Sequence, residues 1–390
     1  KYMISYEVKE NDKVVRRGKV SLDVAPQEKK ELAVNVSGLK AKVGTEYFVN
    51  FSVTTLESEP LVPKGYEIAH EQFRLPIDPA SRSFSVQGPA LQCSENGNLL
   101  SVQSSRVAFV FDKSTGLVTS YKVKGTEYFH EGFGIQPNFW RAPNDNDYGS
   151  QMPKRLQIWK QSSKNFNVVD ASLAMDGKDA VLKVSYLLAA GNLYIATYRI
   201  HPSGVVKANY TFTSTEMEAA KTEASEATLM ATFTPGNEAI RKESSKLVVP
   251  RIGVRFRLPA EMEQVTYFGR GPEENYCDRN NGTLVGEYQA TAEQMYFPYV
   301  RPQENGHHTD TRWLMLKKKN GKGLVVYADS TLEFNSLRNS IEDFDGEEAT
   351  HRDYQWGNRD AEELKHDVST AKNIKPRHTH INDITPRDFV

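Results

Sequence analysis

The sequence has little cysteine, almost no net charge and no long apolar run. Cys93 and Cys277 are its only thiols, and their spacing fits neither a C-x-x-C pair nor a zinc site. The 390 residues carry 49 basic and 50 acidic side chains, for a net charge of −1. This balance excludes the electrostatic surface that nucleic acid or an anionic membrane requires. Apolar runs such as 186–190 are far shorter than the roughly 20 residues of a membrane-spanning helix.

The two cysteines leave the cellular compartment open. We expect both thiols to be buried, but the sequence does not decide whether Cys93 and Cys277 pair in a disulfide. A soluble protein of the cytoplasm or of the periplasm fits these features. No targeting segment is visible at the start, where an alternating strand pattern begins at once.

Apolar residues at every second position predict antiparallel β-strands near the start of the chain. Two segments show this alternation: Tyr2, Ile4, Tyr6 and Val8, and Tyr47, Val49, Phe51 and Val53. Short strands at this spacing are typical of an immunoglobulin-like β-sandwich, which we expect over residues 1–76. Residues 77–83 read as a linker, because Pro76 and Pro79 remove backbone donors from any β-ladder.

The rest of the chain, residues 84–390, continues the strand pattern and predicts a second, larger β-domain. Expected strands lie at 107–111, 181–187, 193–200, 205–212, 248–258, 314–316 and 324–327, with hairpin turns between several of them. Such a domain must bury two large sheets against each other, so the fold class is all-β. Only two short helices are expected, at 216–227 and 360–365.

Two polar loops carry the candidate binding residues. The first has Arg141 followed by Asn144, Asp145 and Asp147, whose oxygens suit saccharide hydroxyls or a calcium ion. They suit equally a loop whose side chains cap their own backbone. The second has Arg301, Glu304 and Asn305 beside Pro302, a set that suits sugar hydroxyls, unless Arg301 and Glu304 simply pair and fix the loop.

Catalytic and metal-binding groups are not expected in the chain itself. A retaining glycosidase needs two carboxyl groups about 5 Å apart, whereas the adjacent Glu273 and Glu274 would point apart. His307-His308-x-Asp310 and His378-x-His380 have strand spacing for zinc, but they lack a third ligand at a defined spacing. We interpret these histidines as solvent-exposed.

Four segments resemble the C-terminal region of the large β-galactosidases of glycoside hydrolase family 2. They are Asn138-Phe-Trp-Arg-Ala-Pro-Asn-Asp-Asn-Asp-Tyr-Gly149, Tyr267-Phe-Gly-Arg-Gly-Pro-Glu-Glu-Asn-Tyr-Cys-Asp-Arg279, Tyr299-Val-Arg-Pro-Gln-Glu-Asn-Gly306 and Thr309-Asp-Thr-Arg-Trp-Leu314. The resemblance implies an immunoglobulin-like domain at 1–76 and a galactose-mutarotase-like antiparallel supersandwich over 84–390. It further implies a parent enzyme that releases terminal β-D-galactosyl residues, as from lactose, with retention.

The same resemblance implies that the catalytic parts lie elsewhere. The family's catalytic glutamates belong to a (β/α) barrel, and no barrel-like pattern occurs here; the family's Gly-Gly-Asp-Asp-Ser-Trp-like segment is also missing. We therefore expect an inactive fragment that packs on the barrel and helps to wall the sugar site. The family's Mg or Ca and Na ions would bind mostly outside this region.

Because family members of this fold have a groove, Arg141, Asp145, Arg301 and Glu304 are expected to converge on one. The alternative is a self-sufficient carbohydrate-binding or aldose-epimerase-like module.

Overall fold

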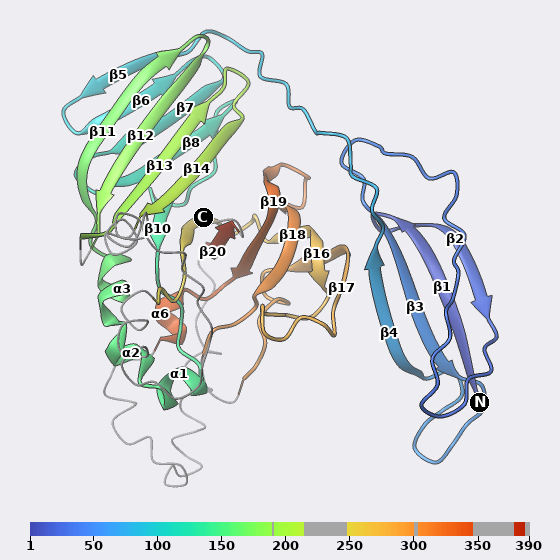
Figure 1. Cartoon of the computed structure of the whole chain (residues 1–390). Coiled ribbons are helices and arrows are strands. Elements are labelled where there is room, and N and C mark those ends of the chain that lie inside the picture. The colour runs from blue at the N-terminus through green and yellow to red at the C-terminus, as the bar shows by residue number, and fades with distance from the viewer. Residues whose placement is uncertain (189–190, 214–247, 300–302, 346–377, 387–390) are drawn as a thin grey trace, which may run out of the picture.

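The regular secondary structure of the described residues is nearly all β, which confirms the predicted fold class. The structure is a computed structural model that describes residues 1–390 apart from 189–190, 214–247, 300–302, 346–377 and 387–390 (Figure 1). The predicted helices at 216–227 and 360–365 lie outside the described residues. No helix within the described ranges is long and apolar enough to cross a membrane.

Residues 1–76 form one four-stranded antiparallel sheet at one side of the molecule. Its strands are β1 (Tyr2–Glu10), β2 (Lys13–Val20), β3 (Tyr47–Thr55) and β4 (Glu67–Arg74). They follow the order β2-β1-β3-β4. The predicted alternating strands are therefore present, but they make a single layer and not both layers of a sandwich.

Two further sheets pack face to face beyond the linker (Figure 1). One contains β5 (Gln92–Asn96), β6 (Leu99–Gln103), β7 (Val107–Asp112), β8 (Leu117–Val123) and β9 (Thr126–Glu127), and the other β11 (Asn167–Asp176), β12 (Asp179–Leu187), β13 (Leu193–Ile200) and β14 (Val206–Thr213). Phe109 of β7 lies 5.7 Å from Tyr198 of β13, ring centroid to ring centroid. The Tyr121 hydroxyl of β8 donates to the Gly204 carbonyl at 2.6 Å. These contacts join the layers as the sequence predicts.

A seven-stranded sheet completes the C-terminal part. Its order is β10 (Gln136–Asn138), β15 (Gly253–Pro259), β20 (His378–Pro386), β19 (Gly323–Leu337), β18 (His308–Lys317), β16 (Gln264–Gly271) and β17 (Leu284–Thr291). Among the described residues, four short helices accompany it: α1 (Asp145–Gly149), α2 (Met152–Arg155), α3 (Gln157–Ser162) and α6 (Ile341–Phe344). The helices gather at the end of the molecule to which β10 leads (Figure 1).

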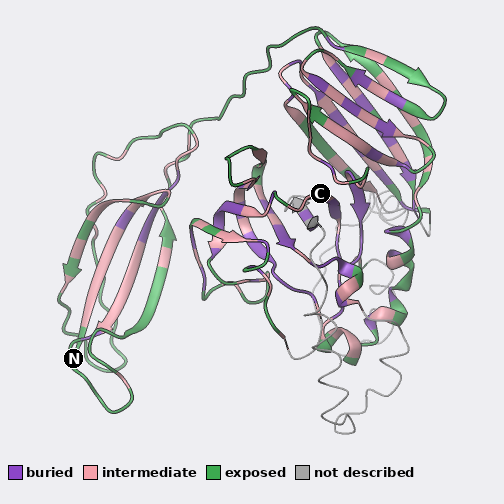
Figure 2. Ribbon diagram, turned by 180° about the vertical axis from the view of Figure 1, so that it is seen from behind, coloured by how far each residue is buried: buried purple, intermediate pink, exposed green. Residues whose placement is uncertain are grey.

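One continuous apolar core runs through these three C-terminal sheets. Figure 2 shows the buried positions alternating along their strands. Fully buried members include Phe111, Phe139, Tyr194, Leu314 and Phe334. This arrangement explains the strength of the period-two signal, since each of these strands has a covered face.

A small junction joins the N-terminal sheet to the seven-stranded sheet. Phe48 of β3 packs with Phe268, Val285 and Trp313. The Gln72 amide of β4 donates to the Val285 carbonyl at 2.9 Å and accepts from the Val285 N–H at 2.8 Å. A side-chain amide thus pairs with one residue of β17 as a strand would.

The cysteines do not form a disulfide. Both are free thiols, with Cys93 half-buried and Cys277 exposed. The expectation that both are buried is therefore wrong for Cys277, which lies on an exposed turn after β16.

Candidate functional site

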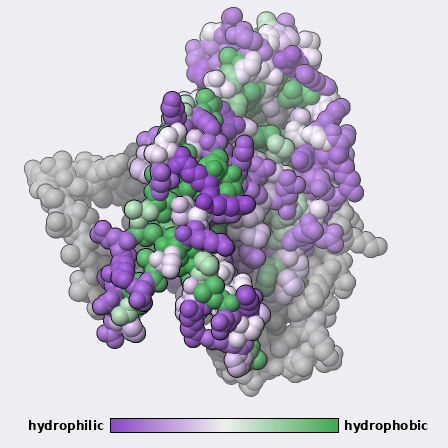
Figure 3. Space-filling view, turned by 90° about the vertical axis from the view of Figure 1, so that its right-hand side faces the viewer, coloured by the Kyte–Doolittle hydropathy of each residue, from purple (hydrophilic) through white to green (hydrophobic). Residues whose placement is uncertain are grey.

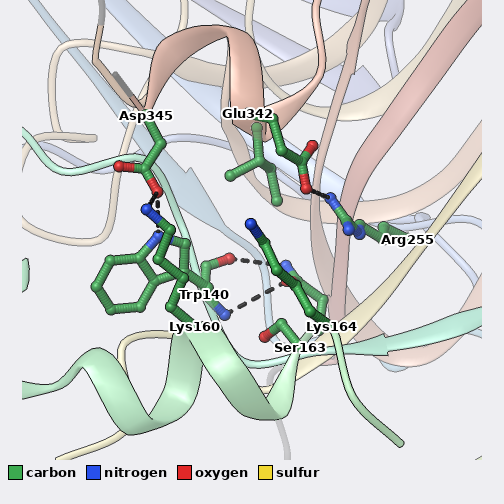
Figure 4. Close-up of a pocket in the computed structure, with 9 residues that line it drawn as sticks. Trp140, Lys160, Ser163, Lys164, Arg255, Glu342 and Asp345 are labelled. Atoms are coloured by element: carbon green, nitrogen blue, oxygen red, sulfur yellow. Dashed lines mark hydrogen bonds and ion pairs between the residues drawn. The ribbon is translucent and has the colours of Figure 1, made fainter. Parts of the chain in front are cut away.

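The first candidate site is a pocket beside Trp140, in the first family-like segment. It has a volume of about 210 Å³ and lies between β10, β15, α3 and α6 (Figure 4). Its lining is mostly polar or charged: Asn138, Trp140, Lys160, Ser163, Lys164, Arg255, Ile341, Glu342 and Asp345. We call it the Trp140 pocket.

Asp345 holds one end of the Trp140 pocket. Its Oδ2 accepts from the Trp140 indole N–H at 2.7 Å and lies 2.8 Å from Lys160 Nζ. The side chain of Asn138, the last residue of β10, donates to the Trp140 carbonyl at 2.8 Å and so fixes the backbone that carries Trp140. Because the Trp140 ring is buried, it cannot serve as an open stacking platform for a sugar.

A second ion pair closes the other end. Arg255 Nη1 lies 2.7 Å from Glu342 Oε1. Burial acts to raise the pKa of Glu342, but Arg255, a backbone hydrogen bond and the Lys164 charge together lower it. Lys164 extends its amine between the two ion pairs (Figure 4). With each carboxylate held by a cation, the pocket suits hydrogen bonding to hydroxyls or anions rather than proton transfer.

Three predicted residues of the first loop come together, but they cap a helix. Asn144 is the N-cap of α1: its side chain accepts from the Asp147 N–H at 3.0 Å, and the Asp147 carboxylate accepts from the Asn144 N–H at 2.9 Å. Asp147 also pairs with both terminal nitrogens of Arg141, at 2.9 Å for one of them. Asp145 lies in the first turn of α1.

This geometry favours the structural alternative for Asn144 and Asp147 over calcium binding. Their oxygens are taken by backbone N–H groups and a guanidinium, which gives a capping box reinforced by an ion pair. Within the described residues, no group of three or more His, Cys, Asp or Glu side chains is placed to hold a metal ion.

Buried side-chain contacts fix the second polar loop, which contains Glu304 and Asn305. Glu304 and Arg251 form an ion pair at 2.9 Å, with both side chains 6% exposed. Asn305 donates to the Phe297 carbonyl at 2.6 Å and accepts from the Phe297 N–H at 2.9 Å. Arg301 lies outside the described residues, so its pairing with Glu304 stays a prediction, as does a shared groove for the two loops. Arg251, the partner that is found, was not anticipated.

Sequence reasoning missed the role of Glu274. Its carboxylate, 6% exposed, lies 2.6 Å from Arg279 Nη2, accepts from the Gly306 N–H at 2.7 Å and accepts from the Tyr299 hydroxyl. We call these four residues the Glu274 cluster. Burial raises the pKa of Glu274 and nearby Glu304 adds to the rise, whereas the Gly306 amide and Arg279 oppose it.

The Glu274 cluster shows that two family-like segments are one structural unit. Asn275 joins the same segment to the residues that follow: its side-chain oxygen accepts from the Thr309 N–H at 3.0 Å, and its own N–H donates to the His307 carbonyl at 2.8 Å. Glu273, in contrast, is exposed. The two adjacent glutamates therefore face different surroundings, as predicted, and Glu274 is fully engaged in holding the loops together.

The histidine interpretation is wrong for His307 and His308, which are 3% and 2% exposed. His307 Nε2 lies 2.9 Å from Glu333 Oε2. His308 packs between Tyr267 and Phe334. Burial lowers the pKa of His308 to about 4, although the Pro272 and Gly306 carbonyls partly oppose the shift. The side chains of residues 378 and 380 lie outside the described part of the chain.

Comparison with known proteins places both parts of the chain. The family model described as "Beta galactosidase small chain" matches residues 103–378, and "Beta-galactosidase, domain 4" matches residues 1–76. A β-galactosidase of Priestia megaterium is 30% identical over 339 residues, which are 86% of this chain and 30% of that protein.

Other relatives agree in name and in coverage. A β-galactosidase of Streptococcus thermophilus is 26% identical over 371 residues, 93% of this chain and 32% of its own length. One of Kluyveromyces lactis is 28% identical over 283 residues, 71% of this chain and 25% of its own length. The chain thus spans less than a third of the length of these curated relatives.

Proposed function

Because the chain belongs to the β-galactosidase small-chain family, we propose that it is the non-catalytic C-terminal region of a longer β-galactosidase. The whole enzyme would hydrolyse terminal β-D-galactosyl residues, as in lactose, with retention. This region would pack on the catalytic barrel and help to wall the galactoside site. The observation that carries the proposal is the tandem match of both family models over residues 1–76 and 103–378.

The contacts of the buried carboxylates Glu274 and Glu304 favour a structural role for them rather than a catalytic one. Retaining hydrolysis needs a free nucleophile and an acid or base that face one glycosidic bond. Glu274 accepts from three donors, and Glu304 is held in its pair with Arg251. Neither is available to attack a sugar without dismantling the loop that it fixes.

Sugar contact by this region remains part of the proposal. Arg141, Asn144 and Asp147 would act by shaping the loop that carries Asp145. The lining of the Trp140 pocket offers donors and acceptors suited to hydroxyl groups. We place the family's Mg or Ca and Na ions mainly outside this region, and the protein in the cytoplasm or the periplasm.

Turnover of a chromogenic β-galactoside tests the proposal. We expect the purified chain to be slower than the longer enzyme by at least about 10⁴-fold, because it lacks both covalent catalysis and proton transfer. Substantial turnover by the chain, abolished by Glu274→Gln or Glu304→Gln, would overturn the proposal. Interconversion of galactose anomers by the chain alone would favour the epimerase-like module instead.

A further inference from the structure

We propose that the Trp140 pocket binds a small oxyanion: a phosphate group, either free or carried as an ester by a small molecule. The pocket has a volume of about 210 Å³, far more than one water molecule needs. This assignment is independent of the proposed function, because it follows from the charges and the open donors of the lining.

The lining of the Trp140 pocket carries one more cation than it has carboxylates. Asp345 holds Lys160 at 2.8 Å, nitrogen to oxygen. Glu342 holds Arg255 at 2.7 Å. The third cation, Lys164, makes no hydrogen bond or ion pair through its ammonium group within the described part of the chain. Its amine extends between the two ion pairs (Figure 4). The pocket therefore keeps a positive charge that an anion would neutralise.

Arg257 adds positive charge next to Arg255. The two residues lie two positions apart on β15, and so on the same face of the strand. The Arg257 guanidinium lies over Phe133, 4.0 Å from the ring centroid, and its buried Nε has no hydrogen-bond partner among the described residues. Three carboxylates act on it electrostatically without an ion pair: Glu131, Glu342 and Asp343. Burial lowers the pKa of Arg257, and Arg255 adds to the fall, while the three carboxylates oppose it. Cations crowd this side of the pocket.

The hydrogen-bonding groups left open in the pocket include an excess of donors. The Ser163 hydroxyl is satisfied, since it donates to the Trp159 carbonyl at 2.9 Å and accepts from the Phe139 N–H at 2.7 Å. Asp345, with its side chain 6% exposed, is held in its ion pair. The ammonium of Lys164, in contrast, offers three N–H donors and no acceptor. Ligand oxygens that accept, as those of phosphate do, match these donors.

The cations are arranged to meet one ligand from two sides. Arg255 is 8% exposed, and β15 pairs it with Gln136 of β10. Lys164 directly follows Ser163, the C-cap of α3, and is exposed, so the anion would enter from solvent on that side. A phosphate between them would accept from a fixed guanidinium and from a mobile ammonium. These are the two cationic groups that bind phosphate in proteins.

Isothermal titration calorimetry of the purified chain with inorganic phosphate tests the site. Hydrophilic side chains cover much of the surface elsewhere, as Figure 3 shows for one side, so about 0.15 M NaCl is used to screen exposed charges. We expect a dissociation constant of about 1 mM or below. Lys164→Gln should weaken binding by at least about tenfold, because a charged donor is lost. Lys178→Gln, exposed on the turn between β11 and β12, should leave it unchanged.

Glu342→Gln should give a change of the opposite sign. It releases Arg255 from its ion pair and removes a carboxylate that repels the anion, so phosphate should bind more tightly by at least about threefold. A variant that merely unfolded could not bind more tightly. Glycerol phosphate identifies the source of the group: tighter binding than that of inorganic phosphate indicates an ester, and equal binding indicates free phosphate.

Three results would each overturn the proposal. The first is the absence of phosphate binding, whether or not galactose binds. The second is equal affinity of the unchanged chain and of Lys164→Gln for phosphate. The third is weaker binding by Glu342→Gln when its far-ultraviolet circular dichroism matches that of the unchanged chain.

Discussion

The N-terminal sheet and the three C-terminal sheets are built from the same alternating strands, but they bury their side chains differently. Along β12 and β13 every second side chain is buried, and Leu182 and Tyr194 are 1% and 0% exposed. Along β1 the equivalent positions Ile4 and Tyr6 are only half-buried, and Val8 alone of this series is fully buried. Alternation therefore shows which face of a strand is apolar, and not whether a second layer covers it.

The largest expected difference between the two regions concerns their aromatic side chains. Phe111→Ala empties a fully buried position in β7 and should lower the free energy of unfolding of the C-terminal part by about 3 to 5 kcal/mol. Phe51→Ala, on the half-covered face of β3, should cost less than half as much. Urea unfolding followed by tryptophan fluorescence measures both, and equal costs would show that the N-terminal sheet is as fully packed as the C-terminal core.

Ion pairs provide the next contrast. Glu304→Gln leaves Arg251 charged in a pair whose side chains are each 6% exposed, so we expect a loss of about 3 kcal/mol in unfolding free energy. Glu7→Gln, in the pair Glu7–Arg17 with side chains 36% and 73% exposed, should change it by less than about 1 kcal/mol. The same urea titration in low and high salt measures both; a small effect for Glu304 would contradict its structural role.

Stability should fall with acid because of His308. Its pKa of about 4 in the fold lies below the value of about 6.5 in an unfolded chain, so the unfolded state binds the proton first. The contribution is complete above pH 6.5 and is lost as the pH falls toward 4, by up to about 3 kcal/mol. His308→Gln should flatten this slope. An unchanged slope in His308→Gln would show that His308 is not the buried neutral group.

Alternation alone predicts the fold class and the positions of many strands. The expected strand 193–200 has the bounds of β13, because its apolar side meets a complementary sheet. The capping role of Asn144 and Asp147 also had a local signal, since an Asx residue followed three positions later by an acid matches a capping box. Local patterns of this kind can be read without the tertiary fold.

Contacts between distant segments could not be predicted in the same way. Glu274 meets Gly306 across 32 positions, and nothing in either motif encodes that approach. The polar neighbours of His307 and His308 predict exposure, but those neighbours are paired within the fold: Thr309, for example, binds Asn275. A polar segment is exposed only where water satisfies its hydrogen bonds; where other protein groups do so, the segment can be buried.

Covalent trapping tests most directly the central claim that no carboxylate of this chain attacks a galactoside. A 2-deoxy-2-fluoro-β-galactoside with an activated leaving group accumulates the glycosyl-enzyme of a retaining galactosidase, and mass spectrometry locates it. We expect no adduct on the isolated chain and one adduct on the longer enzyme, in a peptide outside residues 1–390. An adduct on the peptide of the isolated chain that contains Glu274 or Glu304 would contradict that claim.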